Sequence, residues 1–447
     1  MLSDPIAALA TPSGRSAIAV VRVSGRGALE VAGQVVDGDP LDARRPRVAS
    51  RATFRSANGA PIDQGLVTVF PAPHSYTGED LVELSCHGGL LAPAQLLAAL
   101  EAAGARPAAP GEFTRRAVLN GKLDLLQAEA IGDLIDATAP AQGRAALHQL
   151  DGGLSRRVQA LREDLLDAMA LLSYDIDFPD EDDGPVPRDR IVEGLDRARQ
   201  ALDRLLATAP AGFRLHDGAL VVLAGRPNAG KSSLFNALLG ASRALVTEIP
   251  GTTRDTIEAP SEVLGWPVRL ADTAGLRDAD ERLERLGIEV SRRYVAAADL
   301  VLLCVEAGGD VTPAERVLLD ERPSLLVRSK ADLATGVGAD DGIRVSAVTG
   351  VGLDLLREAI ATRLFGDGAR ADYADLEPML TRERHRTALT HAVVSLDQAR
   401  PELGKGGDPV LAAHHLRGAV TALEELIGLV HPEEVLGRVF ARFCVGK

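Results

Sequence analysis

Residues 225–232 read Gly-Arg-Pro-Asn-Ala-Gly-Lys-Ser, and this stretch decides the fold of the domain around it. Its spacing, Gly-x-x-x-x-Gly-Lys-Ser, is that of a phosphate-binding loop. The apolar run 220–223 before it is typical of a buried parallel strand. After the loop, Leu234 and Leu238 recur at helical spacing, and Gly240 stands where such a helix would end. A strand, a glycine loop and a helix in this order aim backbone N–H groups at phosphate oxygens.

The residue types inside the loop match this chemistry. Glycine is required because a Cβ would block the approach of the phosphate oxygens. Lys231 would neutralise the terminal phosphates, and the Ser232 hydroxyl would bind Mg²⁺. A chance glycine turn is the alternative, but it does not explain why both flanking segments have the correct pattern.

Further motifs follow in the order that is typical of a guanine-nucleotide switch protein. A strand that ends in Asp-x-x-Gly can hold Mg²⁺ through the Asp and sense a γ-phosphate through the Gly amide; Asp272 begins such a motif. A Thr about 20 residues upstream, in the segment 247–255, can add its hydroxyl to the Mg²⁺. Asp332 can accept from both N–H donors of the guanine edge, which adenine cannot supply. The predicted GTP-binding residues are Asn228, Ala229, Gly230, Lys231, Ser232, Ser233, Thr247, Glu248, Ile249, Pro250, Gly251, Thr252, Thr253, Asp272, Thr273, Ala274, Gly275, Ser329, Lys330, Ala331, Asp332, Ser346, Ala347 and Val348.

The motifs depart from the usual pattern in two places. The usual base-recognition motif is Asn-Lys-x-Asp, whereas Ser329 replaces the Asn here, which we expect to loosen contact to the base or to the phosphate loop. Leu276 follows the Asp-x-x-Gly motif, so the glutamine that orients water in Ras-like switches is absent. Glu284 is a candidate for placing the water; the alternative is a surface helix charge. The Asn228 amide could face a monovalent cation that replaces an arginine finger.

Composition limits the remaining functions. The 447 residues suffice for two to four domains. The net charge of −14 argues against a broad nucleic-acid-binding face. The three cysteines, at 86, 304 and 444, are not at metal-binding spacing, which indicates a reducing cytoplasm. We expect no signal peptide, because the first residues carry Asp4 and no basic segment, and no apolar run reaches the roughly 18 residues of a membrane span.

The first 118 residues predict a small α+β domain. Its expected strands are 17–23, 65–70 and 81–84, and its expected helix is 93–103. Arg22 and Glu83 are charged residues inside apolar strands. On composition alone, a mutual ion pair or a solvent-facing side is favoured over a ligand site. The adjacent Cys86 and His87 invite a catalytic interpretation, but neighbouring residues of a strand point to opposite faces and make no nucleophile–base pair.

Helical stripes lie on both sides of the nucleotide domain. Apolar residues recur at helical spacing in 123–135, 154–172 and 191–205, and again in 387–399 and 416–430. The acidic run 175–183 is interpreted as a solvated connection between helices, rather than a metal loop. We therefore predict a nucleotide domain inserted into one helical domain. The predicted boundaries are 1–118 for the N-terminal domain, 119–212 and 369–447 for the two helical parts, and 213–368 for the nucleotide domain.

From end to end the sequence resembles the tRNA-modification GTPase family MnmE (TrmE). Several motifs that carry the resemblance are family-specific, which the GTPase motifs are not. They are Ala-Thr-Pro-Ser-Gly-Arg at 10–15, Tyr-Thr-Gly-Glu-Asp at 76–80, His-Gly-Gly at 87–89, Pro-Gly-Glu-Phe-Thr at 110–114, Leu-Asn-Gly-Lys-Leu-Asp-Leu at 119–125, Asp-Phe-Pro-Asp at 177–180 and Phe-Cys-Val-Gly-Lys at 443–447.

The resemblance implies a homodimer joined through N-terminal domains that are similar to tetrahydrofolate-binding enzymes. With an FAD-containing partner subunit, the family builds an aminomethyl or carboxymethylaminomethyl group on C5 of the wobble uridine of certain tRNAs. Methylene- or formyl-tetrahydrofolate is the implied carbon source, and glycine or ammonium the amine. The family's site residues map onto Arg22, Glu83, Lys122 and Lys447 for folate, Asn228, Thr247, Ile249 and Thr252 for K⁺, Ser232 and Thr253 for Mg²⁺, and Glu284 for water. The folate mapping replaces the ion-pair interpretation of Arg22 and Glu83.

The carboxyl end has several interpretations. Cys444 is fourth from the end, as in prenylated proteins, but Lys447 and Gly446 do not fit that signal. A disordered tail is the stronger alternative, yet apolar residues continue to Phe443, so we expect the tail to dock near the folate site. In the family this cysteine is needed for tRNA modification, which makes Cys444 a candidate catalytic residue.

Two other functions are weighed against this one. A ribosome-assembly GTPase would need a basic RNA module, and the only basic cluster is at 381–386. A folate-dependent enzyme with a merely regulatory GTPase domain is the other. Replacement of Cys444 should abolish tRNA modification and leave GTP turnover intact.

Overall fold

The computed structural model describes residues 4–177, 188–240, 258–272, 293–334, 341–366, 379–430, 433–441 and 443–446. Its contacts divide the chain into two compact units. The first comprises Met1–Gly132, Ser155–Arg162 and Val420–Lys447, and the second comprises Asp133–Leu154 and Glu163–Ala419. The acidic run 175–183 lies mostly outside the described residues.

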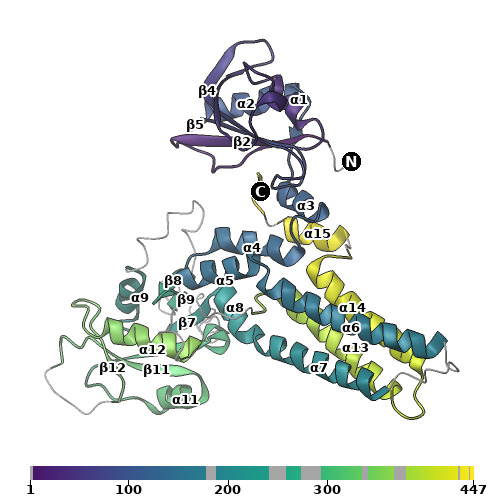
Figure 1. The fold of residues 1–447 in the computed structure, drawn as a ribbon. Helices are drawn as coiled ribbons and strands as arrows, with labels where there is room; N and C mark the ends of the chain where they lie inside the picture. Colours follow the sequence, from purple (N-terminus) through teal and green to yellow (C-terminus); the bar gives the residue numbers. More distant parts are fainter. Residues whose placement is uncertain are drawn as a thin grey trace, which may run out of the picture. The chain divides into compact units, whose positions relative to one another are not determined.

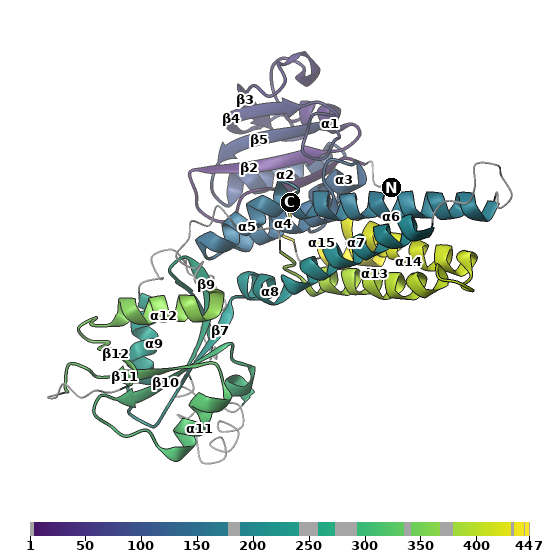
Figure 2. The ribbon, with the colours of Figure 1, turned by 60° about the horizontal axis from the view of Figure 1, so that its bottom comes forward.

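The first unit is built on a six-stranded sheet in the order β3-β4-β5-β2-β1-β6 (Figures 1 and 2). Neighbouring strands are antiparallel except β1 and β6. The strands are β1 Ile6–Leu9, β2 Ile18–Ser24, β3 Ser50–Arg55, β4 Pro61–Phe70, β5 Leu81–His87 and β6 Arg106–Pro107. Apolar alternation along β2 and β5 turns one face towards α1 Ala28–Gly33 and α2 Leu91–Ala102, which complete the core.

The other side of this sheet carries a smaller apolar cluster and the end of the chain. Tyr76 and Phe113 pack on β1 there. Phe113 belongs to α3 Glu112–Leu119, which also packs, with the first residues of α4 Leu125–Asp136, against α15 Glu433–Phe440. The C-terminal residues therefore pack against the N-terminal domain. The Arg22 side chain contacts Gly446, although more than 400 residues separate the two in the sequence.

The second unit contains a six-stranded sheet in the order β12-β11-β10-β7-β9-β8, in which only β8 runs antiparallel. The strands are β7 Ala219–Ala224, β8 Glu258–Val263, β9 Trp266–Asp272, β10 Leu300–Glu306, β11 Ser324–Ser329 and β12 Ile343–Arg344. Helices α9 Lys231–Gly240 and α12 Leu353–Phe365 cover one face, and α11 Pro313–Glu321 covers the other (Figure 2). Because β10 is covered on both faces, it is apolar almost throughout.

Further helices precede and follow this sheet domain in the sequence. They are α5 Pro140–Leu150, α6 Gly153–Asp177, α7 Arg188–Ala207, α8 Ala209–Asp217, α13 Glu383–Glu402 and α14 Pro409–Ile427. Helix α7 lies along α13 (Figure 1), and two ion pairs, Arg199–Asp397 and Arg400–Asp196, connect them. The predicted fold class, an α/β nucleotide domain inserted between helical segments, is confirmed. The three boundaries between the predicted domain segments stay predictions. Among the described residues, no helix is long and apolar enough to cross a membrane.

Candidate functional site

Those predicted nucleotide residues that the structure describes lie at one edge of the second sheet. The phosphate loop follows β7, Asp272 ends β9, Ser329 ends β11, and Ser346 follows β12. These four strands are parallel, so their carboxyl ends meet at the same edge, which is the usual place for ligands in such sheets. The structure thus brings together motifs that are separated by more than 100 residues.

The backbone of the phosphate loop requires its glycines. Gly225 has a φ of 138°, and a Cβ there would lie 2.3 Å from the carbonyl oxygen of Cys304 on β10. Gly230 has a φ of 78°, and Asn228 also adopts a left-handed conformation, with a φ of 62°. The buried Lys231 donates from Nζ to the carbonyl oxygens of Gly225 and Arg226, at 3.0 and 2.8 Å. The ammonium is therefore held at the loop itself.

Oxygen ligands suitable for Mg²⁺ lie beside the loop. The hydroxyl of Ser232 donates to Oδ2 of Asp272 at 2.7 Å. A hydroxyl and a carboxylate are the hard oxygen donors that Mg²⁺ prefers, so the residues present fit this ion. Thr253, the other predicted Mg²⁺ residue, lies outside the described residues.

The base loop is tied to the phosphate loop through Ser329. Its buried hydroxyl donates to the carbonyl oxygen of Ala229 at 2.7 Å, and the carbonyl oxygen of Val305 lies 3.3 Å away. The replacement of Asn by Ser therefore retains a direct connection to the phosphate loop. Lys330 has a φ of 55° and forms an ion pair with Glu306, and the exposed Asp332 is two residues further on.

The last base-side motif is held by its own turn. The buried Ser346 donates its N–H to the carbonyl oxygen of Val351, and its hydroxyl accepts from the N–H of Thr349 at 3.1 Å. The backbone N–H of Ala331 bonds to Val345, which joins the two base-side loops. Ala347 is half-buried and Val348 is 86% exposed, so their side chains are available at the surface.

Several predicted site residues lie outside the described part of the chain. They are Thr247, Glu248, Ile249, Pro250, Gly251, Thr252, Thr253, Thr273, Ala274, Gly275, Glu284 and Lys447. Their predicted roles in cation binding, γ-phosphate sensing, water placement and folate binding stay predictions.

The first unit brings Arg22 and Glu83 together as direct partners across β2 and β5. The guanidinium of Arg22 donates from Nε and Nη2 to Oε1 of Glu83, at 3.1 and 2.7 Å. It also lies 5.5 Å from the ring centre of Tyr76 and 5.7 Å from that of Phe113. The mutual ion pair considered from composition therefore exists, and the ligand role remains a prediction.

The chain's end docks beside this pair. Nη1 of Arg22 donates to the carbonyl oxygen of Gly446 at 3.4 Å, and the N–H of Gly111 donates to that of Cys444, also at 3.4 Å. A Cβ at Gly446 would lie 2.3 Å from the carbonyl oxygen of Leu9, so the tail approaches β1 closely. The thiol-bearing residue Cys444 is exposed. Lys122 reaches the same part of the unit, where Nζ donates to the carbonyl oxygen of Pro73 at 3.1 Å.

The adjacent Cys86 and His87 form no catalytic pair. Cys86 is buried in the core of the sheet, whereas His87 is exposed and its Nδ1 lies 2.9 Å from Asp63. The side chains of these two residues point to opposite faces of β5, as the strand pattern predicts.

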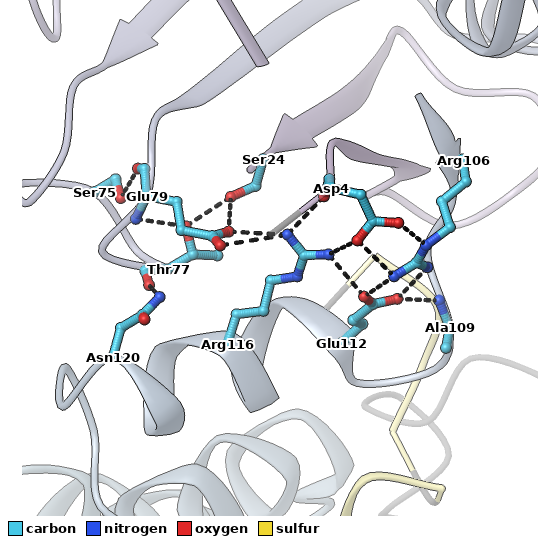
Figure 3. Close-up of polar contacts among 10 residues, drawn as sticks. All are labelled: Asp4, Ser24, Ser75, Thr77, Glu79, Arg106, Ala109, Glu112, Arg116 and Asn120. Atoms are coloured by element: carbon cyan, nitrogen blue, oxygen red, sulfur yellow. Dashed lines mark hydrogen bonds and ion pairs between the residues drawn. The ribbon is translucent and has the colours of Figure 1, made fainter. Parts of the chain in front are cut away.

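A partly buried ion network in the first unit was not predicted from the sequence. It consists of Asp4, Glu79, Arg106, Glu112 and Arg116 (Figure 3). One local signal was available, because Glu112 and Arg116 are four residues apart and share a helix face. The contacts of Asp4 and Glu79 join segments that are at least 37 residues apart, which no local pattern reveals.

Two family models together match nearly the whole chain. The model described as GTP-binding protein TrmE N-terminus matches residues 5–122, and the MnmE helical domain model matches residues 125–444. The chain belongs to the MnmE family. A protein of Akkermansia muciniphila, named tRNA modification GTPase MnmE, is 42% identical over 100% of both chains. The protein of the same name from Aquifex aeolicus is 39% identical, again over 100% of both.

Membership of the MnmE family confirms the predicted enzyme class, a P-loop GTPase. Solved structures similar to this chain include the G domain of the Thermotoga maritima FeoB iron transporter, at 28% identity and a TM-score of 0.24, covering 32% of this chain and 98% of that one. Another is Aquifex aeolicus Era, at 21% identity and a TM-score of 0.27, covering 39% and 66%. At these TM-scores the likeness carries no argument of its own.

Proposed function

We propose that this chain is a GTPase that takes part in tRNA modification. With an FAD-containing partner, it adds an aminomethyl or carboxymethylaminomethyl group to C5 of the wobble uridine of certain tRNAs, and a tetrahydrofolate derivative provides the carbon. The observation that carries this proposal is the full-length similarity to proteins named tRNA modification GTPase MnmE. A G domain alone would not favour it, because G domains serve many functions.

In the nucleotide half, Lys231 neutralises the terminal phosphates and Asp332 selects guanine. Ser232, Asp272 and Thr253 would hold Mg²⁺, which supplies positive charge to the phosphate oxygens. Asn228, Thr247, Ile249 and Thr252 would hold K⁺, and Glu284 orients the attacking water. The short Ser232–Asp272 contact supports the Mg²⁺ assignment, because it places two oxygen donors together beside the phosphate loop.

In the N-terminal half, Arg22, Glu83, Lys122 and Lys447 would hold the folate. The donor set suits this ligand, because folates carry carboxylates that arginine and lysine can bind and an amino-pterin ring that can donate to a carboxylate. Cys444, exposed on the tail that contacts Arg22, would lie close to the one-carbon unit. The folate supplies the carbon that is transferred.

We also propose that two copies associate through their N-terminal domains in the cytoplasm. Ile18 on β2 and Leu66 on β4 are 61% and 46% exposed. Exposed apolar side chains on a sheet are the kind of surface that a second copy can cover, which supports the homodimer. The FAD-containing subunit and tRNA are the other proposed partners.

The decisive experiment is mass analysis of wobble-uridine nucleosides from cells lacking this protein. We expect the C5-modified nucleosides to disappear and to return when the wild-type chain is supplied. An unchanged nucleoside profile would refute the proposal. In the purified protein, GTP should be preferred over ATP, and replacement of K⁺ by Na⁺ should slow GTP hydrolysis. Indifference to the cation would remove Asn228 from a cation site.

A further inference from the structure

The partly buried network shown in Figure 3 joins five charged residues from four segments of the first unit, with Glu112 and Arg116 both on α3. Its centre is Arg116, whose side chain is only 1% exposed. Nη1 donates to the carbonyl oxygen of Asp4 at 2.9 Å and to Oε2 of Glu79 at 3.1 Å. Nη2 donates to Oδ1 of Asp4 at 3.2 Å and to Oε1 of Glu112 at 3.0 Å.

Arg106 completes the network from β6. It donates to Oδ2 of Asp4 at 2.6 Å and to both carboxylate oxygens of Glu112, at 2.5 and 2.8 Å. Three carboxylates therefore share two guanidinium groups. Loss of Arg116 or Glu112 is costly, because it leaves the other buried charge without this partner. The network consequently fixes the relative positions of the segments that carry it.

Two of these segments carry the aromatic rings that flank Arg22. Glu79 belongs to the loop of Tyr76, and Glu112 is adjacent to Phe113 on α3. The Tyr76 hydroxyl also lies 2.8 Å from Thr114 Oγ1, which joins the loop to the same helix. A displacement of the loop relative to α3 would thus move both rings against the Arg22 guanidinium.

The loop is held at further points around Glu79. The Ser24 hydroxyl donates to Oε2 of Glu79 at 3.2 Å and lies 2.7 Å from Thr77 Oγ1. Ser24 is the last residue of β2, the strand that carries Arg22. Glu79 therefore links Arg116 both to the Tyr76 loop and to the strand of Arg22.

The tail depends on the same helix. Gly111, directly before α3, donates its N–H to the carbonyl oxygen of Cys444. A Cβ at Gly111 would lie 2.9 Å from the carbonyl oxygen of Phe440, so the tail packs closely against the start of the helix. Any shift of α3 would therefore change the position of Cys444 as well as that of the rings.

We propose that Glu79 and Arg116 are positioning residues for the site formed by Arg22 and the Cys444 tail. They contact neither the folate nor the transferred carbon, and they act through Tyr76, Phe113 and α3. This inference rests on the proposed folate function. A misplacement of about 1 Å in a reacting site costs roughly a hundredfold in rate, so a network that fixes two ring positions matters to the chemistry.

The test uses Glu79→Gln and Arg116→Lys in the full-length chain. Gln keeps the shape of Glu79 but loses its charge, and Lys keeps the charge of Arg116 but loses its forked geometry. The matched control is Arg55→Lys, which alters an exposed ion pair with Asp37 in the same unit. Formyl-tetrahydrofolate affinity should fall severalfold in both test variants, with GTP turnover unchanged and the control equal to wild type.

A second readout needs no folate. Cys86 and Cys304 are buried, and burial raises the pKa of both thiols, so an aromatic disulfide reagent should label Cys444 selectively in the native chain. In the test variants the reagent should label Cys444 at least severalfold faster, because the C-terminal tail is no longer held against the start of α3. The labelling rates of wild type and Arg55→Lys should be equal.

The outcomes separate this inference from the proposed function. If the wild-type chain does not bind the folate, the proposed function fails, and the labelling rates still test the network. If it binds and Glu79→Gln matches it in folate affinity and in labelling rate, the positioning role is refuted. Should Arg116→Lys fail to fold, Glu79→Gln decides alone, with circular dichroism confirming that it is folded.

Discussion

At the residue scale, the Ser329 hydroxyl joins two loops that arise from different strand ends. Ser329→Ala removes the donor to the Ala229 carbonyl oxygen, 2.7 Å away inside the protein. We expect GTP affinity to fall about five- to thirtyfold, which corresponds to the ~1–2 kcal/mol of a buried hydrogen bond. Titration with a fluorescent GTP analogue measures this loss.

The control for this change is Ser324→Ala on the same strand. The Ser324 hydroxyl donates to the carbonyl oxygen of Leu319 at 3.1 Å, away from the nucleotide loops. It should leave GTP affinity unchanged. Equal affinities for Ser329→Ala and wild type would mean that the base loop is positioned without this bond.

Glu112 predicts a pH dependence of stability. Burial alone would raise the pKa of Glu112, but hydrogen bonds from Arg106, the Ala109 N–H and Arg116 outweigh it and lower the pKa from 4.5 to about 2. A carboxylate with a depressed folded-state pKa stabilises the fold above its unfolded pKa and loses that contribution as pH falls. Glu112→Gln should therefore be less stable than wild type by about 3 kcal/mol near pH 7, at about 1.4 kcal/mol per pKa unit.

The difference between the two proteins should shrink as the pH falls from 4.5 towards about 2. Hydrogen exchange of peptides from α3, corrected for intrinsic exchange rates, measures the opening free energy at each pH. A difference that stays constant across this window would contradict the assigned charge interaction.

At the scale of elements, the passage from β7 into the phosphate loop depends on Gly225. Gly225→Ala would bring a Cβ to 2.3 Å from the Cys304 carbonyl oxygen at a φ that L residues rarely adopt. Because a backbone carbonyl cannot yield without separating β7 from β10, we expect a loss of several kcal/mol in domain stability and no measurable GTP binding. Trp266, the chain's one tryptophan, stacks on Phe365 in this domain and reports its unfolding by fluorescence.

Gly143→Ala on α5 is the comparison variant, since a Cβ there meets no atom within 4 Å and helices favour alanine. It should unfold like wild type or slightly later. Wild-type GTP binding by Gly225→Ala would contradict the assigned close approach.

Elements were predictable wherever a local pattern suffices. The apolar run before the phosphate loop became β7, and the alternation around Arg22 and Glu83 became β2 and β5. The strand 50–55 was not predicted, because it mixes Arg, Thr and Phe without a strong apolar alternation. Its partner β4 was expected to begin at residue 65 but begins at Pro61. The added residues include polar ones and pair only with β3, so no local pattern marks them as a strand.

At the scale of the whole molecule, the two proposed chemistries belong to different units. Cys444 lies in the first unit and the phosphate loop in the second. Cys444→Ser should therefore leave GTP turnover within about twofold of wild type and abolish wobble-uridine modification. Phosphate release and nucleoside mass analysis give the two readouts. Loss of both activities would contradict this division of roles.

The meeting of the described nucleotide motifs at one sheet edge could be predicted from sequence, because each motif is a short segment placed by one strand end. The Arg116 network could not, because Asp4 and Arg116 are 112 residues apart and only the tertiary fold makes them neighbours. Ser329 shows an intermediate case. Its position was predicted, but its bond to Ala229, 100 residues away, was not.

The pairing of α7 with α13 has a consequence for synthesis on the ribosome. Helix α7 ends at Ala207 and α13 begins at Glu383, so the partner emerges roughly 175 residues later. At about 5–20 residues per second, that is a delay of about 10–35 seconds. During this interval α7 lacks the helix that lies along it in the folded chain, where its residues Ile191, Leu195 and Leu202 are buried. The nascent chain should therefore engage chaperones at α7, and it should release them once α13 has been translated.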